Sequence, residues 1–141
     1  MDIYFEFISN HSLLFAALLL VIVLLLQTIF SDATRKYKLI SPPEAVRLIN
    51  REEAVVIDTR NKAEFKDGHI SDAILIPLPE IKDSIEKLNK HEGRPLLFYC
   101  KSGTRSDEAC KTLGKLGLSN VYALSGGIQA WKDAGMPLVK K

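Results

Sequence analysis

The chain has 141 residues, enough for one domain of ordinary size with a short extension. Its 19 basic and 17 acidic residues nearly balance, so the charge gives no reason to expect binding to nucleic acid. Two cysteines and three scattered histidines offer no metal-ligand spacing, and we expect neither a metal site nor a cofactor.

The first predicted element is a hydrophobic helix near the N-terminus. Residues 13–30 carry no charged side chain, and most of them are Leu, Ile, Val or Phe. As an α-helix they would extend about 27 Å, close to the roughly 30 Å hydrocarbon core of a bilayer. We therefore predict a short segment at 1–11, a transmembrane helix at 12–30 and a linker at 31–37.

Two other interpretations of this helix are a buried core helix and a cleaved signal peptide. A helix that is hydrophobic on every face does not suit the core of a small domain, and no Lys or Arg precedes the hydrophobic stretch as in a signal peptide. Arg35, Lys36 and Lys38 follow it. The positive-inside rule then predicts a single pass through the inner (plasma) membrane, with the N-terminus outside and the rest of the chain in the cytoplasm. In that reducing compartment Cys100 and Cys110 should stay free thiols.

Strands and helices are predicted to alternate after the linker. Continuous hydrophobic stretches, typical of strands buried on both faces of a parallel sheet, occur at 54–57, 73–76, 96–99 and 121–124, and a short strand is expected at 37–40. Helices are expected at 42–50, 62–67, 79–89, 106–116 and 128–131. The alternation predicts one α/β domain at 38–137, with a mostly parallel central sheet, helices on both faces and a tail at 138–141.

Two of these helices have a capping box at their start. Ser41 and Glu44 form the first, and Asn61 and Glu64 form the second.

Cys100 follows a buried strand directly and precedes a short loop and a helix. Ligands of parallel α/β sheets bind outside the carboxyl ends of the strands, which is where this cysteine is predicted to lie. Gly103 lets the loop turn its N–H groups inward, and these groups and the helix N-terminus favour negative charge on the sulfur. The remaining loop residues supply cations and hydroxyl donors: Lys101, Ser102, Thr104, Arg105 and Ser106. The pattern predicts a nucleophilic thiolate rather than the alternative, a structural buried cysteine.

The loop and several other segments resemble motifs of the rhodanese-type sulfurtransferases, in that family's order. These segments are 56–60, 64–65, 68–70, 76–77, 99–106, 124–131 and 135–137. With its predicted anchor, the chain is similar to the membrane-anchored single-domain rhodaneses of bacteria. It departs from the family at Asp72, where glycine is common, and at Leu75, where asparagine is common, and both departures concern loop packing rather than chemistry.

The resemblance implies a sulfurtransferase with a covalent intermediate. Cys100 would attack a small anionic sulfane-sulfur donor such as thiosulfate and become a persulfide. It would then pass the sulfur to a thiophilic acceptor, which is cyanide in an assay or a thiol or protein sulfur acceptor in the cell, in a ping-pong cycle. The loop 101–106 would bind the donor and the persulfide. Asp58 and Arg60 are expected to support neighbouring loops.

The sequence interpretation gives two further residues structural roles. His69 is expected to be a structural histidine in a turn. Cys110 is expected to be a buried core residue, with a resolving thiol as its alternative.

Two other functions compete with sulfur transfer. Rhodanese-like phosphatases and arsenate reductases resemble this fold, but the phosphatase loop has one more residue between cysteine and arginine, so the four residues between Cys100 and Arg105 favour sulfur. The second alternative is a membrane-tethered docking module for membrane or secretion machinery, acting through its surface rather than its thiol.

Overall fold

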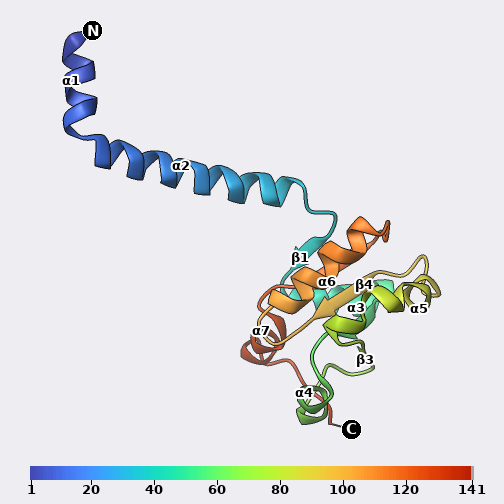
Figure 1. The fold of residues 1–141 in the computed structure, drawn as a ribbon. Coiled ribbons are helices and arrows are strands. Elements are labelled where there is room, and N and C mark those ends of the chain that lie inside the picture. Colours follow the sequence, from blue (N-terminus) through green and yellow to red (C-terminus); the bar gives the residue numbers. More distant parts are fainter. Residues whose placement is uncertain (141) are drawn as a thin grey trace. The chain divides into compact units, whose positions relative to one another are not determined.

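The computed structural model describes residues 1–140, except for the side chain of Asp32. The chain divides into two compact units, Met1–Arg35 and Lys36–Lys141 (Figure 1).

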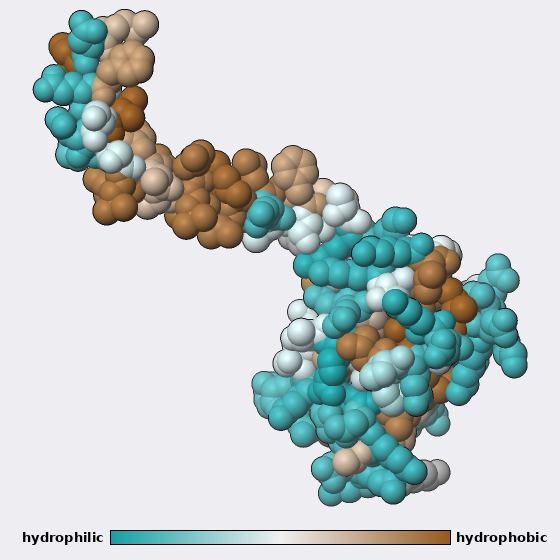
Figure 2. Space-filling model, in the orientation of Figure 1, coloured by the Kyte–Doolittle hydropathy of each residue, from teal (hydrophilic) through white to brown (hydrophobic). Residues whose placement is uncertain are grey.

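The N-terminal unit consists of two helices, α1 (Asp2–Asn10) and α2 (Ser12–Ala33). Residues Ser12–Ser31 have a mean hydropathy of 2.9 and none of them is buried, so α2 is long and hydrophobic enough to be a candidate membrane span. Figure 2 shows its surface as an almost continuous hydrophobic band. The helix α1 was not predicted. Phe7 of α1 contacts the ring of Phe15 of α2 at a centroid distance of 6.2 Å, and that of His11, between the two helices, at 4.7 Å.

The second unit is built on a five-stranded parallel sheet in the order β1-β5-β4-β2-β3. Its strands are β1 (Lys38–Ile40), β2 (Val55–Asp58), β3 (Ile74–Leu75), β4 (Leu96–Tyr99) and β5 (Val121–Leu124). Every residue of β2 and β4 is buried, as their continuous hydrophobicity predicts. By contrast, β3 is half-buried, because it lies at the edge of the sheet with a neighbour on one side only.

Helices cover both faces of the sheet, which confirms the predicted fold class. The helices α5 (Ile85–Asn89) and α6 (Thr104–Lys115) pack on one face, and α3 (Pro42–Glu52) and α7 (Gly127–Asp133) pack on the other. Successive residues of a strand point to opposite faces, so Phe98 packs with α6 and Tyr99 with α3 and α7. The short helix α4 (Lys62–Asp67) follows β2.

The helix predicted at 79–89 is wrong as a single element. The structure has two 3₁₀ turns, η1 (Leu78–Glu80) and η2 (Lys82–Ser84), before α5. The hydroxyl of Ser84 donates to the carbonyl of Glu80 at 2.9 Å, an arrangement that competes with regular helical bonding. Ile81 and Leu88 are nevertheless buried, because the hydrophobic spacing determines which side faces the core and not which helix type forms.

Three smaller features differ from the sequence expectations or extend them. The helix α6 begins at Thr104, two residues earlier than predicted. Asp72 adopts the left-handed backbone conformation, with φ of 61°, that a glycine would adopt without strain. Val139, in the expected tail, forms a two-way backbone bridge with His69, with N–O distances of 2.9 and 2.8 Å.

Candidate functional site

Cys100 lies at the carboxyl end of β4, whose neighbours in the sheet are β2 and β5. Its side chain is free of any disulfide and only 1% exposed. The three residues after it form the loop, and α6 then begins at Thr104. The loop therefore connects the strand that ends at this cysteine to the N-terminus of α6.

Two groups of the loop and helix contact the sulfur. The N–H of Gly103 donates to Cys100 Sγ at 3.0 Å, and Ser106 Oγ lies 3.6 Å from the same sulfur. The hydroxyl of Ser106 also donates to the carbonyl of Gly103 at 3.0 Å. Gly103 has φ of 108°, a left-handed conformation that favours glycine. The Gly103 N–H would stabilise negative charge on Sγ, and the Ser106 proton, donated to the Gly103 carbonyl, helps to hold that residue in place.

The N-terminal end of α7 also contacts the loop, through hydrogen bonds to two of its backbone carbonyls. The N–H of Ile128 donates to the carbonyl of Cys100 at 2.8 Å, and the N–H of Gln129 donates to that of Lys101 at 3.2 Å. Because a trans peptide points its N–H opposite to its carbonyl, the next two loop N–H groups face away from α7. Gly127 makes this approach possible: a Cβ there would overlap the Cys100 carbonyl oxygen and lie 2.7 Å from that of Lys101.

The other predicted loop residues differ in exposure. Lys101, Ser102 and Thr104 are exposed, Gly103 and Arg105 are half-buried, and Ser106 is fully buried. A cleft of about 540 Å³ opens beside the loop, with Ser102, Gly103 and Thr104 in its wall. Cys100 itself is not among the residues that line this cleft.

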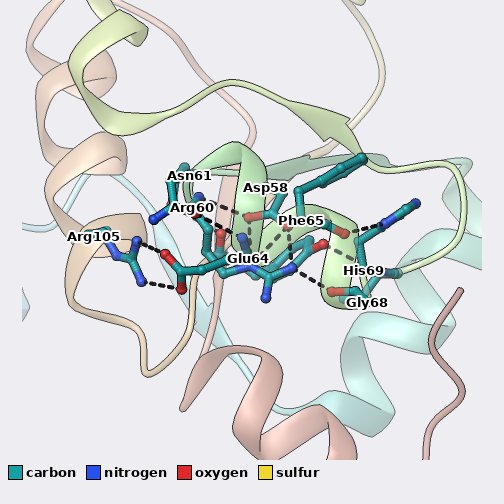
Figure 3. Close-up of polar contacts among 11 residues, drawn as sticks. Asp58, Arg60, Asn61, Glu64, Phe65, Gly68, His69 and Arg105 are labelled. Atoms are coloured by element: carbon teal, nitrogen blue, oxygen red, sulfur yellow. Dashed lines mark hydrogen bonds and ion pairs between the residues drawn. The ribbon is translucent and has the colours of Figure 1, made fainter. Parts of the chain in front are cut away.

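Asp58 and Arg60, predicted to support neighbouring loops, form a buried ion pair at the end of β2 (Figure 3). Arg60 Nη2 lies 2.7 Å from Asp58 Oδ2 and donates to the carbonyl of Gly68, also at 2.7 Å. Burial alone would lower the pKa of Arg60, but the hydrogen bond and charge of Asp58 outweigh it and raise the pKa. The pair thus ties the strand end to Gly68, the residue that ends α4.

Glu64 is a site residue that the sequence interpretation did not identify. Figure 3 shows its carboxylate facing the guanidinium of Arg105, and the distances are 2.7 Å from Nη1 to Oε1 and 3.0 Å from Nη2 to Oε2. The capping box assigned Glu64 a role within its own helix, and the side chain of Asn61 does accept from the Glu64 N–H at 2.8 Å. Nothing in the local pattern points to a partner 41 residues away.

His69 and Cys110 have structural positions, as expected. His69 is buried, stacks on Phe65 at a centroid distance of 3.8 Å, and places Nδ1 2.9 Å from the Phe65 carbonyl oxygen. Cys110 is fully buried in the core between α6 and the sheet, and burial raises the pKa of its thiol. A thiol in that environment is poorly suited to act as a resolving nucleophile.

Comparison with known proteins assigns the family. The family model of the rhodanese-like domain matches residues 41–134. The chain belongs to the rhodanese-like domain family. This rhodanese-like chain is 36% identical over 136 residues to YibN, an uncharacterized protein of Escherichia coli (strain K12), covering 96% of this chain and 95% of YibN.

A second relative and a solved structure match most of the rhodanese-like unit. The thiosulfate sulfurtransferase GlpE of Coxiella burnetii (strain RSA 331) is 32% identical over 96 residues, covering 68% of this chain and 88% of GlpE. The crystal structure of a rhodanese-related protein from Thermoplasma volcanium is similar with a TM-score of 0.67 and 30% identity, covering 74% of this chain and all of that one.

Proposed function

We propose that this protein is a sulfurtransferase that carries sulfane sulfur as a persulfide on Cys100. The observation that supports it most is the N–H of Gly103, which is directed at the sulfur of buried Cys100 from 3.0 Å. A fixed donor at that distance favours an anionic sulfur, both in the thiolate and in the persulfide. Relatives named sulfurtransferase support the same class of reaction.

The first half-reaction loads the sulfur. With thiosulfate as donor, the thiolate of Cys100 attacks the outer sulfur and forms a new S–S bond. The S–S bond of thiosulfate breaks, and its electron pair leaves with sulfite. Lys101, which is exposed, is available to attract the anionic donor, while Gly103 and Ser106 hold the sulfur.

The second half-reaction unloads it. A thiolate of a small molecule or a protein, or cyanide in an assay, attacks the outer sulfur of the persulfide. The S–S bond to Cys100 breaks and the electron pair returns to Cys100 as thiolate. The result is ping-pong kinetics with a covalent intermediate.

The decisive measurement is the intact mass of the protein after treatment with thiosulfate. We expect a gain of one sulfur, on the order of 32 Da, that a small thiol removes and that Cys100→Ser lacks. Turnover of a generic aryl phosphate at a rate comparable to thiosulfate:cyanide transfer would instead support a phosphatase. A Cys100→Ser variant that fully restores a deletion phenotype would support the docking role.

We further propose that α2 anchors the catalytic domain, residues 38–137, to the plasma membrane with the N-terminus outside. The hydropathy of α2 and the basic residues that follow it support this orientation. In intact cells, Ser9→Cys should react with a membrane-impermeant maleimide, whereas Ser119→Cys should react only after permeabilisation. The opposite labelling pattern would reverse the orientation.

A further inference from the structure

The pair formed by Glu64 and Arg105 occupies a position that bears on the choice of sulfur donor. Arg105 lies in the first turn of α6, five residues after the nucleophilic cysteine, and both of its terminal nitrogens bond to the carboxylate of Glu64. An arginine fork bound in this bidentate way presents to its partner the same two N–H donors that would bind a sulfonate, sulfate or phosphate group. Glu64 therefore occupies the oxyanion-binding edge of Arg105.

Glu64 is held in place from both ends of α4. Asn61 caps the N–H of Glu64, and Arg60 binds the carbonyl of Gly68 at the other end while paired with buried Asp58 (Figure 3). The carboxylate is thus presented to Arg105 by a helix whose two ends are fixed. Because α4 is fixed in this way, Glu64 loses less conformational entropy when it pairs with Arg105.

The pair stays ionised at neutral pH. The hydrogen bond from Arg105 lowers the pKa of Glu64, and the hydrogen bond to Glu64 raises the pKa of Arg105. Arg105 directly precedes Ser106, whose Oγ lies 3.6 Å from Cys100 Sγ, so the pair is next in the chain to a group that contacts the sulfur. Two opposite charges in contact contribute little net charge to the site, and the contacts to Sγ come from a neutral N–H and a hydroxyl.

We propose that Glu64 is a specificity-determining residue that makes the loop disfavour oxyanionic donors, thiosulfate included, and favour a thiol persulfide, R–S–SH. The proposal rests on the sulfurtransferase function proposed above. In the favoured reaction, the thiolate of Cys100 attacks the outer sulfur of R–S–SH. The donor S–S bond breaks, its electron pair leaves with R–S⁻, and Cys100 becomes Cys–S–SH, with the hydrogen remaining on the transferred sulfur.

The test compares Glu64→Gln with Glu86→Gln in the full chain. Glu86 is a matched control, since it is exposed and also lies in the first turn of a short helix, α5. Each protein is assayed with thiosulfate and with glutathione persulfide. We expect Glu64→Gln to raise the ratio of kcat/KM for thiosulfate to kcat/KM for the persulfide by about tenfold, the scale of one charge-assisted bidentate contact, while Glu86→Gln leaves it unchanged.

Binding of inorganic phosphate, measured by calorimetry, gives a readout independent of sulfur transfer. Glu64→Gln should bind phosphate about tenfold more tightly than the unaltered chain, and the double variant Glu64→Gln/Arg105→Gln should lose that gain. Unchanged phosphate affinity in a folded Glu64→Gln, or the same gain without Arg105, would overturn the proposal. A preference of the unaltered chain for thiosulfate would overturn it as well.

The outcomes separate this inference from the proposed function. If neither donor adds sulfur to Cys100, the sulfurtransferase function fails even where the phosphate results agree. If both donors load Cys100 but the donor ratio is insensitive to Glu64, the function stands and the specificity role fails. If Glu64→Gln is folded and loads neither donor, Glu64 positions the loop and is not a filter.

Discussion

The two cysteines of this chain are almost equally buried, yet their surroundings are opposite. Cys100 is 1% exposed and Cys110 is 0% exposed. The sulfur of Cys100 receives an N–H at 3.0 Å under a loop, whereas that of Cys110 lies among hydrophobic side chains, with the Tyr122 carbonyl oxygen 3.8 Å away. The comparison teaches that two equally buried thiols can differ in the polar groups that reach the sulfur, and the function proposed for Cys100 depends on that difference.

The largest expected effect comes from substituting each cysteine in turn. Cys100→Ser should abolish both persulfide formation and thiosulfate:cyanide transfer, because a hydroxyl is a far weaker nucleophile than a thiolate at neutral pH. Cys110→Ala should keep both, and intact-mass measurement after thiosulfate treatment checks this. If a folded Cys110→Ala variant also lost the mass gain, Cys110 would be required for persulfide formation, which contradicts the prediction.

The next effect separates the loop from the core. Gly127→Ala would push a Cβ into the Cys100 carbonyl, so we expect at least about a hundredfold loss of kcat through displacement of the loop. Gly135→Ala is the matched control, because it also has positive φ but has no atom within 4 Å of the added Cβ. Gly135→Ala should lose roughly 1 kcal/mol of unfolding free energy from backbone strain, and Gly127→Ala should lose more because its Cβ also overlaps backbone atoms. Equal activity in the two variants would mean that the contact with α7 does not shape the loop.

A smaller effect sharpens the description of Cys110. Its raised pKa means that above a pH of about 8.5 the unfolded thiol ionises while the folded thiol stays protonated, so stability falls as pH rises. Between pH 7 and 10 the unaltered chain should lose about 2 kcal/mol more unfolding free energy than Cys110→Ala, as measured by urea titration. Parallel pH profiles would show that the core around Cys110 admits water.

The smallest effect concerns the second contact to Cys100. Ser106→Ala removes one hydroxyl that lies 3.6 Å from the sulfur and bonds to the Gly103 carbonyl. A lost hydrogen bond of about 1 kcal/mol corresponds to roughly a fivefold slower transfer. Thr104→Ala, an exposed hydroxyl in the same turn, serves as the control and should change the rate less. Equal transfer rates for the two variants would show that the Ser106 hydroxyl does not contribute to the reaction at Cys100.

The sequence predicted the parts of this molecule that depend on local pattern. Continuous hydrophobicity identified the central strands, and the glycine between Cys100 and Arg105 indicated a turn directly before α6. Long-range pairing was harder: the partner of Arg105 lies on α4, and the carbonyl of Cys100 is bound by α7. Such contacts depend on which strands become neighbours in the sheet, and the sequence of a single segment does not predict that order.

The hydrophobic pattern also did not predict which type of helix forms at residues 78–89. The spacing of Ile81 and Leu88 correctly indicated their inward direction, but a 3₁₀ turn and an α-helix can both present such a spacing to the core. Proline residues before and within this stretch, and the bond from Ser84 to Glu80, decided the outcome locally. The departure at Asp72 was tolerated because aspartate enters the left-handed region at modest cost.

The contact between α7 and the carbonyls after β4 has a consequence for biosynthesis. A ribosome makes Cys100 well before it makes Gly127 and the two donors that follow. Until those residues have been made, the carbonyls of Cys100 and Lys101 lack their hydrogen-bond donors on α7. The loop therefore reaches its final conformation only after most of the chain has been made, and a chain that stops before Gly127 lacks the donors that fix the backbone on which the proposed reaction depends.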